Sequence, residues 1–409
     1  MSVVTAPQVL RRLRWTWLPG NIGLALVWGA ITAVLLAVQI QRIDPAGKVG
    51  HLAVATSLGA LVTMLVQPVA GQLSDRTRSR LGRRAPWIIG GAATGTLAMI
   101  GMSFATSIPA LIGMYLVVVV TYNSAQLPMS AVLPDRVPEN RRGTFSALAG
   151  AGQMLGNLGG QVIASRLAGT PGVAYWVVAG LTLVFTVGFV LLNPDVSSRE
   201  VLARPLGWLD LLRSYWVNPR RHPDFGWVFL GRFLLMSGYF ISNSYQLYLL
   251  QDYVGLGERA VDYMPLLALT TLVMVIVFTL VGGPLSDRSG GRRKVFIYVS
   301  GCLFALGLLV PLLMPTLTGM VVASVIGGMG FGVFGSVDGA LMTEVLPSRE
   351  GYAKDLGVIN LSFSLPQTLG PVLAGAVVTV TGGYAVLFPV GAALAVAGAF
   401  AVRFVKKVA

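Results

Sequence analysis

The amino-acid sequence predicts an all-α membrane protein with twelve transmembrane helices, arranged as two six-helix bundles related by pseudo-two-fold symmetry. Three observations lead to this prediction. First, 55% of the 409 residues are hydrophobic and only 11% are charged, and the mean hydropathy is +0.73, whereas a soluble protein carries about 25% charged residues. Second, the charged residues are separated by long uncharged stretches. Third, short motifs of the first half recur in the same order in the second half.

The uncharged stretches predict the order of the helices. A membrane-spanning helix needs about 20 apolar residues. Three of the stretches are long enough for two helices each, and each has turn residues near its middle, at 107–109, 315–317 and 381–383. Counting these three stretches twice yields twelve helices. The stretches without Asp, Glu, Lys or Arg are 15–41, 49–74, 85–134, 143–165, 167–194, 233–251, 263–286, 295–337 and 356–402.

The basic residues predict the orientation of these helices. If both termini are cytoplasmic, 25 of the 30 Lys and Arg residues fall in cytoplasmic segments, four fall outside, and Arg232 lies within a helix. Cytoplasmic loops of membrane proteins carry such an excess of Lys and Arg. We therefore expect a multi-pass protein of the plasma (inner) membrane with both termini in the cytoplasm. In this orientation the basic loops lie against the anionic inner leaflet of the lipid bilayer, which explains the net charge of +14. A nucleic-acid partner is not needed to explain it.

The longest polar segment, at about 195–225, divides the helices into two sets of six. Within it, Trp208, Leu209, Leu211 and Leu212 have helical spacing, which favours an amphipathic helix on the membrane surface. The predicted domains are an N-terminal six-helix bundle at 1–194, a cytoplasmic linker at 195–225 and a C-terminal six-helix bundle at 226–409.

Three pairs of motifs indicate an internal duplication. The segment 71–76 (GQLSDR) recurs 212 residues later as 283–288 (GPLSDR), and 135–138 (DRVP) recurs 209 residues later as 344–347 (EVLP). Leu158-Gly159-Gly160 matches Leu369-Gly370-Pro371 at a separation of 211. Three matches in order at nearly one separation are specific, and two similar six-helix halves suit a protein that rocks about a central site.

The first of these motifs extends from Gly71 to Trp87, and its pattern G-x-x-x-D-R-x-x-x-R resembles the signature of the major facilitator superfamily. The resemblance covers the whole chain and implies a transporter that works by alternating access. A glycine at position 71 allows a close helix contact, and Asp75 can accept hydrogen bonds from a helix N-terminus or an arginine. These groups would form a conformational latch; the alternative is that the arginines only set the topology. The candidate latch residues are Gly71, Asp75, Arg76, Arg80, Asp135, Arg142, Gly283, Asp287, Arg288 and Glu344.

Three patches resemble one branch of that superfamily, the glycoside–pentoside–hexuronide:cation symporters and the sucrose transporters. They are Arg83 to Trp87, Tyr122 to Asp135, and Leu356 to Gln367. The resemblance implies a sugar or glycoside as the solute. Two positions depart from the sucrose-transporter pattern: Val119 stands where those proteins have the aspartate implicated in proton coupling, and Ser130 stands where they have an arginine. The predicted second helix contains no aspartate within 51–73, so a sodium site is not supported.

Two ionisable residues fall inside predicted helices, Arg232 and Asp338. A charge within a membrane span indicates a functional site. With a rise of 1.5 Å per residue, Arg232 lies about 10 Å deep and Asp338 about 6 Å deep, so the two can form an ion pair. The functional interpretation is a switchable charge pair or a proton-coupling site. The alternative is that Arg232 extends to the interface and Asp338 pairs with a loop residue such as Arg292.

Polar side chains at helical spacing predict a cavity for a small-molecule solute. A sugar needs amide and hydroxyl partners for its hydroxyl groups and an aromatic plane for its C–H face. The alternative is hydrogen bonding between helices, which contributes only about 0.6 kcal/mol per contact. The candidate substrate-binding residues are Trp28, Tyr122, Asn123, Gln126, Gln153, Asn157, Tyr239, Asn243, Gln246, Asn360 and Gln367.

The sequence contains no pattern typical of an enzyme or a metal site. Cys302 is the only cysteine, and His51 and His222 are far apart in the chain. Gly330 to Gly335 matches G-x-G-x-x-G but lies within a predicted helix, so we expect its glycines to allow close helix packing and not to bind a dinucleotide. We therefore expect a monomeric transporter of a small polar solute, without a cofactor and either proton-coupled or uncoupled. The alternatives are a proton-linked exporter of amphipathic compounds and a non-transporting membrane sensor or scaffold.

Overall fold

A computed structural model of the chain describes residues 7–138, 141–195, 197–198, 222–288, 293–345 and 352–405. Within these ranges the chain is helical and contains no strand, which confirms the all-α fold class. It forms two compact units, Met1–Pro205 (unit 1) and Leu206–Ala409 (unit 2). Most of the segment expected to form a cytoplasmic linker with an amphipathic helix lies outside the described residues.

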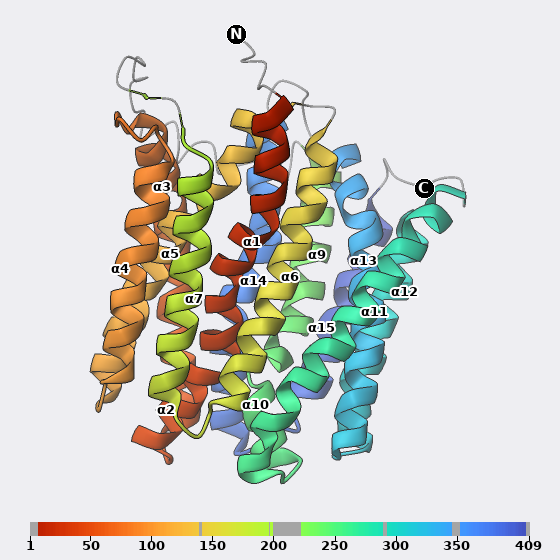
Figure 1. The fold of residues 1–409 in the computed structure, drawn as a ribbon. Coiled ribbons are helices and arrows are strands. Elements are labelled where there is room, and N and C mark those ends of the chain that lie inside the picture. Colours follow the sequence, from red (N-terminus) through yellow and green to blue (C-terminus); the bar gives the residue numbers. More distant parts are fainter. Residues whose placement is uncertain are drawn as a thin grey trace. The chain divides into compact units, whose positions relative to one another are not determined.

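Unit 1 begins with one long helical segment, in which the π-helical turn η1 (Ile31–Leu35) joins α1 (Pro7–Ala30) to α2 (Leu36–Ile43). Proline in the first turn begins α4, α5 and α7, a position that needs no backbone N–H donor. The other helices of this unit, shown in Figure 1, are α3 (Lys48–Arg76), α4 (Ala85–Ser103), α5 (Ile108–Arg136), α6 (Arg142–Arg166) and α7 (Pro171–Leu192).

Unit 2 begins with α9 (Pro223–Asn243), which is continued by α10 (Gln246–Tyr248) and the π-helical turn η3 (Leu249–Tyr253). The short 3₁₀ turns η4 (Gly257–Arg259) and η5 (Val402–Phe404) precede α11 and end the last helix. The remaining helices are α11 (Ala260–Arg288), α12 (Arg293–Leu313), α13 (Leu317–Val345), α14 (Tyr352–Thr381) and α15 (Leu387–Ala401) (Figure 1).

In the described part of the chain, eleven helical segments are long and apolar enough to cross a membrane. The helix α6 is the remaining long one; it is rich in glycine and contains three amide side chains. The connections α4–α5, α12–α13 and α14–α15 lie where turn residues predict them. The helix order therefore agrees with the twelve predicted spans.

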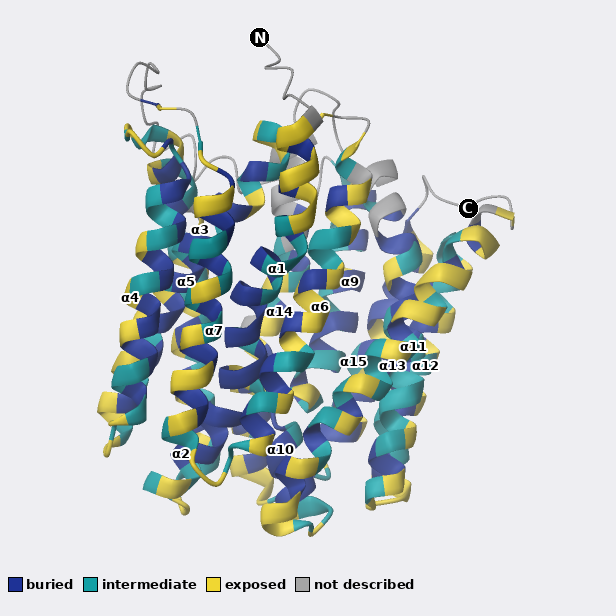
Figure 2. Cartoon of the chain, in the orientation of Figure 1, coloured by how far each residue is buried: buried dark blue, intermediate teal, exposed yellow. Residues whose placement is uncertain are grey.

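Helices α7 and α11 expose large apolar side chains. Trp176, Val184 and Leu191 are exposed on α7, as Figure 2 shows by the exposed bands along that helix. Leu280 and Val281 are exposed on α11. Exposed large apolar side chains of this kind are unfavourable in water and stable in hydrocarbon.

The two units have the same pattern of helix pairs. In unit 1, α1 packs against α6 and α7, α5 packs against α3 and α4, and α4 packs against α7. In unit 2, α9 packs against α14 and α15, α13 packs against α11 and α12, and α12 packs against α15. Each helix of the first unit thus has a counterpart with the same neighbours, as a duplication requires.

Glycines allow the closest of these contacts. A Cβ atom at Gly160 of α6 would collide with the backbone of α1 at Leu26, and one at Gly332 of α13 would lie 2.7 Å from the carbonyl oxygen of Val275 in α11. The packing role expected for Gly332 is therefore confirmed. The close contact expected at Gly71 is not found: within the described residues, a Cβ atom at Gly71 meets nothing within 4 Å, and the same holds for its counterpart Gly283.

Gln39 of α2 connects this helix to the turn between α4 and α5. Its side-chain nitrogen donates to the carbonyl oxygens of Met102 at 2.7 Å and Ala105 at 3.3 Å. We expect Gln39→Leu to lower the free energy of unfolding by about 1–2 kcal/mol, because the two carbonyls lose a buried donor. Thermal unfolding in detergent will measure the loss, and Gln153→Leu, at an exposed glutamine of the same unit, serves as the control that leaves stability unchanged.

Candidate functional site

At one end of unit 1, a buried arginine connects three helices. Arg84, directly before α4, forms ion pairs with Asp75 at the end of α3 (2.6 Å) and with Asp135 at the end of α5 (3.0 Å). It also donates to the Ser74 hydroxyl at 3.0 Å. Its side chain is only 10% exposed. A buried arginine with several acceptors fixes the relative positions of the helix ends that supply them.

The predicted latch residues surround this arginine but do not include it. Arg76 and Arg80 form no ion pair with a described residue, and Arg80 is exposed. Arg142 donates to the carbonyl oxygens of Val137 and Pro134. The sequence signal for Arg84 was its place in the patch Arg83 to Trp87, directly before the first turn of a helix.

The repeat of this motif in unit 2 is only partly described. Gly283 lies near the end of α11, Ser286 is buried and Arg288 is exposed. The side chains of Asp287 and Glu344 lie outside the described residues. The latch role of the motif therefore stays a prediction.

In unit 2, Arg232 of α9 and Asp338 of α13 form a buried ion pair with an N–O distance of 2.9 Å. Their side chains are 8% and 11% exposed. Arg232 also donates to the carbonyl oxygen of Ile359 in α14 at 3.3 Å, and it lies 5.6 Å from the ring centroid of Phe363. The structure thus contains the geometry of the predicted pair, and both charges lie within an apolar core of the unit.

Two of the candidate solute residues of unit 1 contact each other, and a third contacts polar residues of α3. Trp28 of α1 donates from Nε1 to the Gln126 side-chain oxygen of α5 at 3.1 Å. Asn123 accepts from Gln67 of α3 and donates to Thr63, both at 3.3 Å. These contacts place an aromatic ring and three amides on helices α1, α3 and α5.

The other candidates of unit 1 differ in exposure. Tyr122 is fully buried against α4, where its hydroxyl faces the Met99 sulfur at 3.5 Å. Gln153 and Asn157 are exposed on α6. Of the candidates on α14, Gln367 is exposed, and the Asn360 side chain lies outside the described residues.

The remaining three candidates line one cavity of about 80 Å³ within unit 2. Tyr239, Asn243 and Gln246 supply one wall, and the other walls come from α11, α12, α13 and α15. The Tyr239 ring packs against Phe304 and Phe331 at centroid distances of 5.5 and 5.2 Å. The cavity therefore combines two amides, a phenol and an aromatic wall, which sequence spacing placed on one face of a helix.

The family model described as MFS/sugar transport protein matches residues 46–406 of this chain. The chain is also 44% identical over 50 residues to the general alpha-glucoside permease of Schizosaccharomyces pombe (strain 972 / ATCC 24843). This short match covers 12% of the chain and spans 9% of the length of that permease.

Solved transporters have the same fold. The nucleoside transporter NupG (D323A mutant) is similar with a TM-score of 0.78 and 15% identity, over 97% of this chain and 100% of that one. The peptide transporter POT in complex with sulfate has a TM-score of 0.71 and 14% identity, over 98% and 95% of the two chains. A bacterial homologue of the human lysosomal transporter Spinster has a TM-score of 0.65 and 15% identity, over 98% and 96%.

Proposed function

Because the chain belongs to the MFS/sugar transport proteins of the major facilitator superfamily, and is therefore a multi-pass membrane transporter, we propose that its solute is a sugar or glycoside. The solute crosses the plasma membrane by alternating access between the two units. The observation that supports this solute class is the cavity of unit 2, where Tyr239, Asn243 and Gln246 lie together. The short match to an alpha-glucoside permease supports the same class.

The chemistry of the cavity suits part of a sugar. Neither Asn243 nor Gln246 forms a side-chain hydrogen bond with a described residue, so both amides are free to bind hydroxyl groups. The rings of Tyr239 and Phe304 offer an apolar wall for C–H groups. At about 80 Å³, against about 300–1,000 Å³ for pockets that enclose a drug-sized ligand, the cavity takes only part of a sugar. The remainder of the sugar then lies outside it.

The test is uptake into proteoliposomes of a labelled panel of α-glucosides, nucleosides and short peptides. We expect saturable α-glucoside uptake, with Asn243→Leu and Gln246→Leu each raising the half-saturating concentration about 2- to 10-fold, because each removes hydrogen bonds worth about 0.5–1.5 kcal/mol. Ser237→Ala, on the same helix, is the control, because its hydroxyl donates to the Phe233 carbonyl. Uptake of nucleosides or peptides in place of glucosides contradicts the proposed solute class.

Two further outcomes of this experiment would indicate one of the alternative functions, a membrane sensor or scaffold, or an exporter of amphipathic compounds. A sensor or scaffold binds an α-glucoside without exchanging labelled for unlabelled solute across the vesicle membrane. An exporter of amphipathic compounds transports apolar cations and leaves the sugars outside. Either result contradicts the proposal.

We further propose that the transporter is a monomer without a cofactor, and that Arg232 and Asp338 couple transport to protons. We also propose that both termini are cytoplasmic, because the loops on the same side of the membrane as the termini carry most of the basic residues. The support for coupling is the position of an ion pair inside the apolar core of unit 2, since a membrane-buried carboxylate is suited to carrying a proton.

A further inference from the structure

We propose that the first turns of α1 bind the headgroup of an anionic phospholipid, through the exposed side chains of Arg11, Arg12 and Trp15. This surface lies in unit 1 and is separate from the latch, the ion pair and the unit 2 cavity. It gives the bilayer a defined binding site on the protein, beyond the general attraction of basic loops to an anionic leaflet.

The start of α1 has two opposite faces. Leu10, Leu13 and Trp17 are buried and recur at helical spacing, so they face the rest of unit 1. Trp17 anchors this face, because its Nε1 donates to the Phe145 carbonyl oxygen at 2.9 Å. The exposed residues of these turns are Gln8, Val9, Arg11, Arg12, Arg14 and Trp15, with Thr16 partly exposed. Of these, Gln8, Arg11, Arg12, Trp15 and Thr16 lie together.

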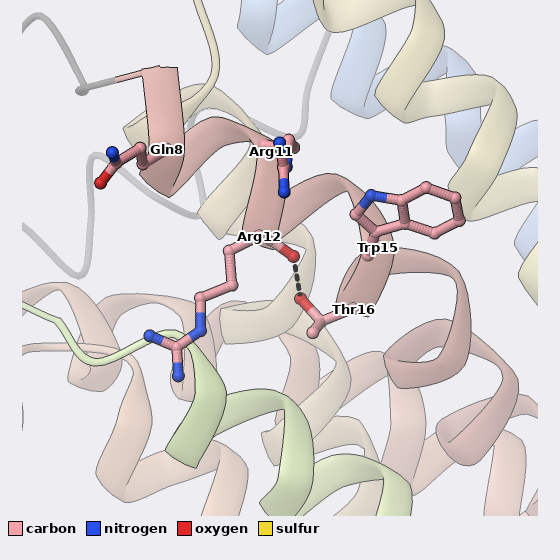
Figure 3. Close-up of a pocket in the computed structure, with 5 residues that line it drawn as sticks. All are labelled: Gln8, Arg11, Arg12, Trp15 and Thr16. Carbon is pink, nitrogen blue, oxygen red and sulfur yellow. Dashed lines mark hydrogen bonds between the residues drawn. The ribbon is translucent and has the colours of Figure 1, made fainter.

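These side chains line one open hollow of about 610 Å³. Figure 3 shows them projecting from successive turns of α1, with the Thr16 hydroxyl donating to the Arg12 carbonyl oxygen at 3.0 Å. Thr16 also accepts from the Asn193 amide at 2.7 Å, so its hydroxyl is engaged within the protein. The side chains that remain for a ligand are the two guanidinium groups, the Gln8 amide and the indole.

No described residue forms an ion pair with the arginines of this face, Arg11 and Arg12, and both are exposed. A guanidinium group binds phosphate through two parallel hydrogen bonds. The guanidinium groups of the consecutive residues Arg11 and Arg12 therefore attract a phosphodiester headgroup.

Trp15 identifies the ligand as a lipid and not as a free anion. Its side chain is 77% exposed, which is unfavourable in water for so large an apolar surface. It stands at the start of the uncharged stretch 15–41, and tryptophan is enriched where a transmembrane helix meets the headgroup layer. The arginines thus reach the phosphate while the indole lies along the acyl chains below it.

The test is thermal unfolding of the full-length protein in neutral detergent, titrated with phosphatidylglycerol or with phosphatidylcholine of the same acyl chains. We expect phosphatidylglycerol to raise Tm and phosphatidylcholine to leave it nearly unchanged. Since each basic residue near an anionic surface contributes about fivefold in binding, Arg11→Gln/Arg12→Gln should weaken the apparent affinity for phosphatidylglycerol about 25-fold.

The matched control is Arg166→Gln/Arg259→Gln, which removes the same charge from two other exposed arginines and should keep the response of the wild type. Equal loss in both double variants would overturn the proposal in favour of net charge alone. An equal rise of Tm with inorganic phosphate would assign the site to a free anion.

A second measurement separates binding at this face from a change in stability. Phosphatidylglycerol brominated on its acyl chains should quench tryptophan fluorescence more than brominated phosphatidylcholine does. The difference between the two lipids should disappear in Trp15→Phe and persist in Trp176→Phe, another exposed tryptophan. Persistence in Trp15→Phe would show that the lipid lies elsewhere.

Discussion

Replacing Arg84 with glutamine is expected to lower the free energy of unfolding of unit 1 by about 2–4 kcal/mol, which is a large part of the stability of a domain. The substitution leaves Asp75 and Asp135 without the guanidinium that pairs with both. Removing one member of a buried ion pair destabilises a protein by more than the intact pair stabilises it, because the remaining charge stays desolvated. Asp75 is 58% exposed and Asp135 is 29% exposed, so solvent reduces the effect at both carboxylates. Arg83, 3.8 Å from Asp135, reduces it further, so we expect the lower end of this range.

Thermal unfolding in detergent measures this effect, with Arg78→Gln as the control. Arg78 belongs to the same connection between α3 and α4, is exposed and forms no ion pair with a described residue. Arg84→Lys keeps the charge but lacks the planar guanidinium that pairs with two carboxylates, so it should recover only part of the stability. An Arg84→Gln variant that unfolds at the temperature of the wild type would contradict the central role of this side chain.

The helices of this protein could be predicted from local sequence because their solvent is a hydrocarbon. A charged residue is unfavourable inside a span wherever the rest of the chain lies, so the uncharged stretches reveal the helices directly. The stretch 85–134 illustrates this: its turn residues at 107–109 mark the end of α4 and the start of α5. The motif repeats predicted the duplication because each half preserves the same helix ends.

The contacts of the site depend on partners that are distant in the sequence. The connection after α3 contains several arginines, and Arg84 differs from the others because it contacts both Asp75 and Asp135, the latter 51 residues away. Gly71 was expected to pack closely because of its motif, yet the closest approaches of a glycine to the backbone of another helix occur at Gly29 and Gly160, between α1 and α6. The periodicity of a helix indicates which residues share a face, but not which neighbouring helix covers that face.

The pair of Arg232 and Asp338 is a contact that sequence could predict, since both residues lie inside spans and at similar depth. Each charge restricts where the other can lie, because an isolated charge in an apolar core is much less stable than a paired one. The structure adds Ile359 and Phe363, which bring α14 to the same arginine. The arginine thus connects three helices of unit 2, as Arg84 does in unit 1.

We expect Asp338→Asn to lower the free energy of unfolding of unit 2 by about 3–5 kcal/mol, because Arg232 then remains buried without its carboxylate partner. Arg232→Gln should have a similar effect. The double variant Arg232→Gln/Asp338→Asn should recover most of the lost stability, since neither charge is then unpaired. Asp262→Asn is the control, an exposed aspartate of the same unit, and should unfold like the wild type.

The same double variant tests the proposed coupling, because it should retain the fold while removing the carboxylate that we propose carries the proton. In proteoliposomes with an imposed proton gradient, the wild type should accumulate solute, whereas the double variant should exchange labelled for unlabelled solute without accumulating it. Removal of the carboxylate abolishes the site at which a proton and a conformational change can be linked. Accumulation at the wild-type level in the double variant would show that the pair is structural and that any coupling group lies elsewhere.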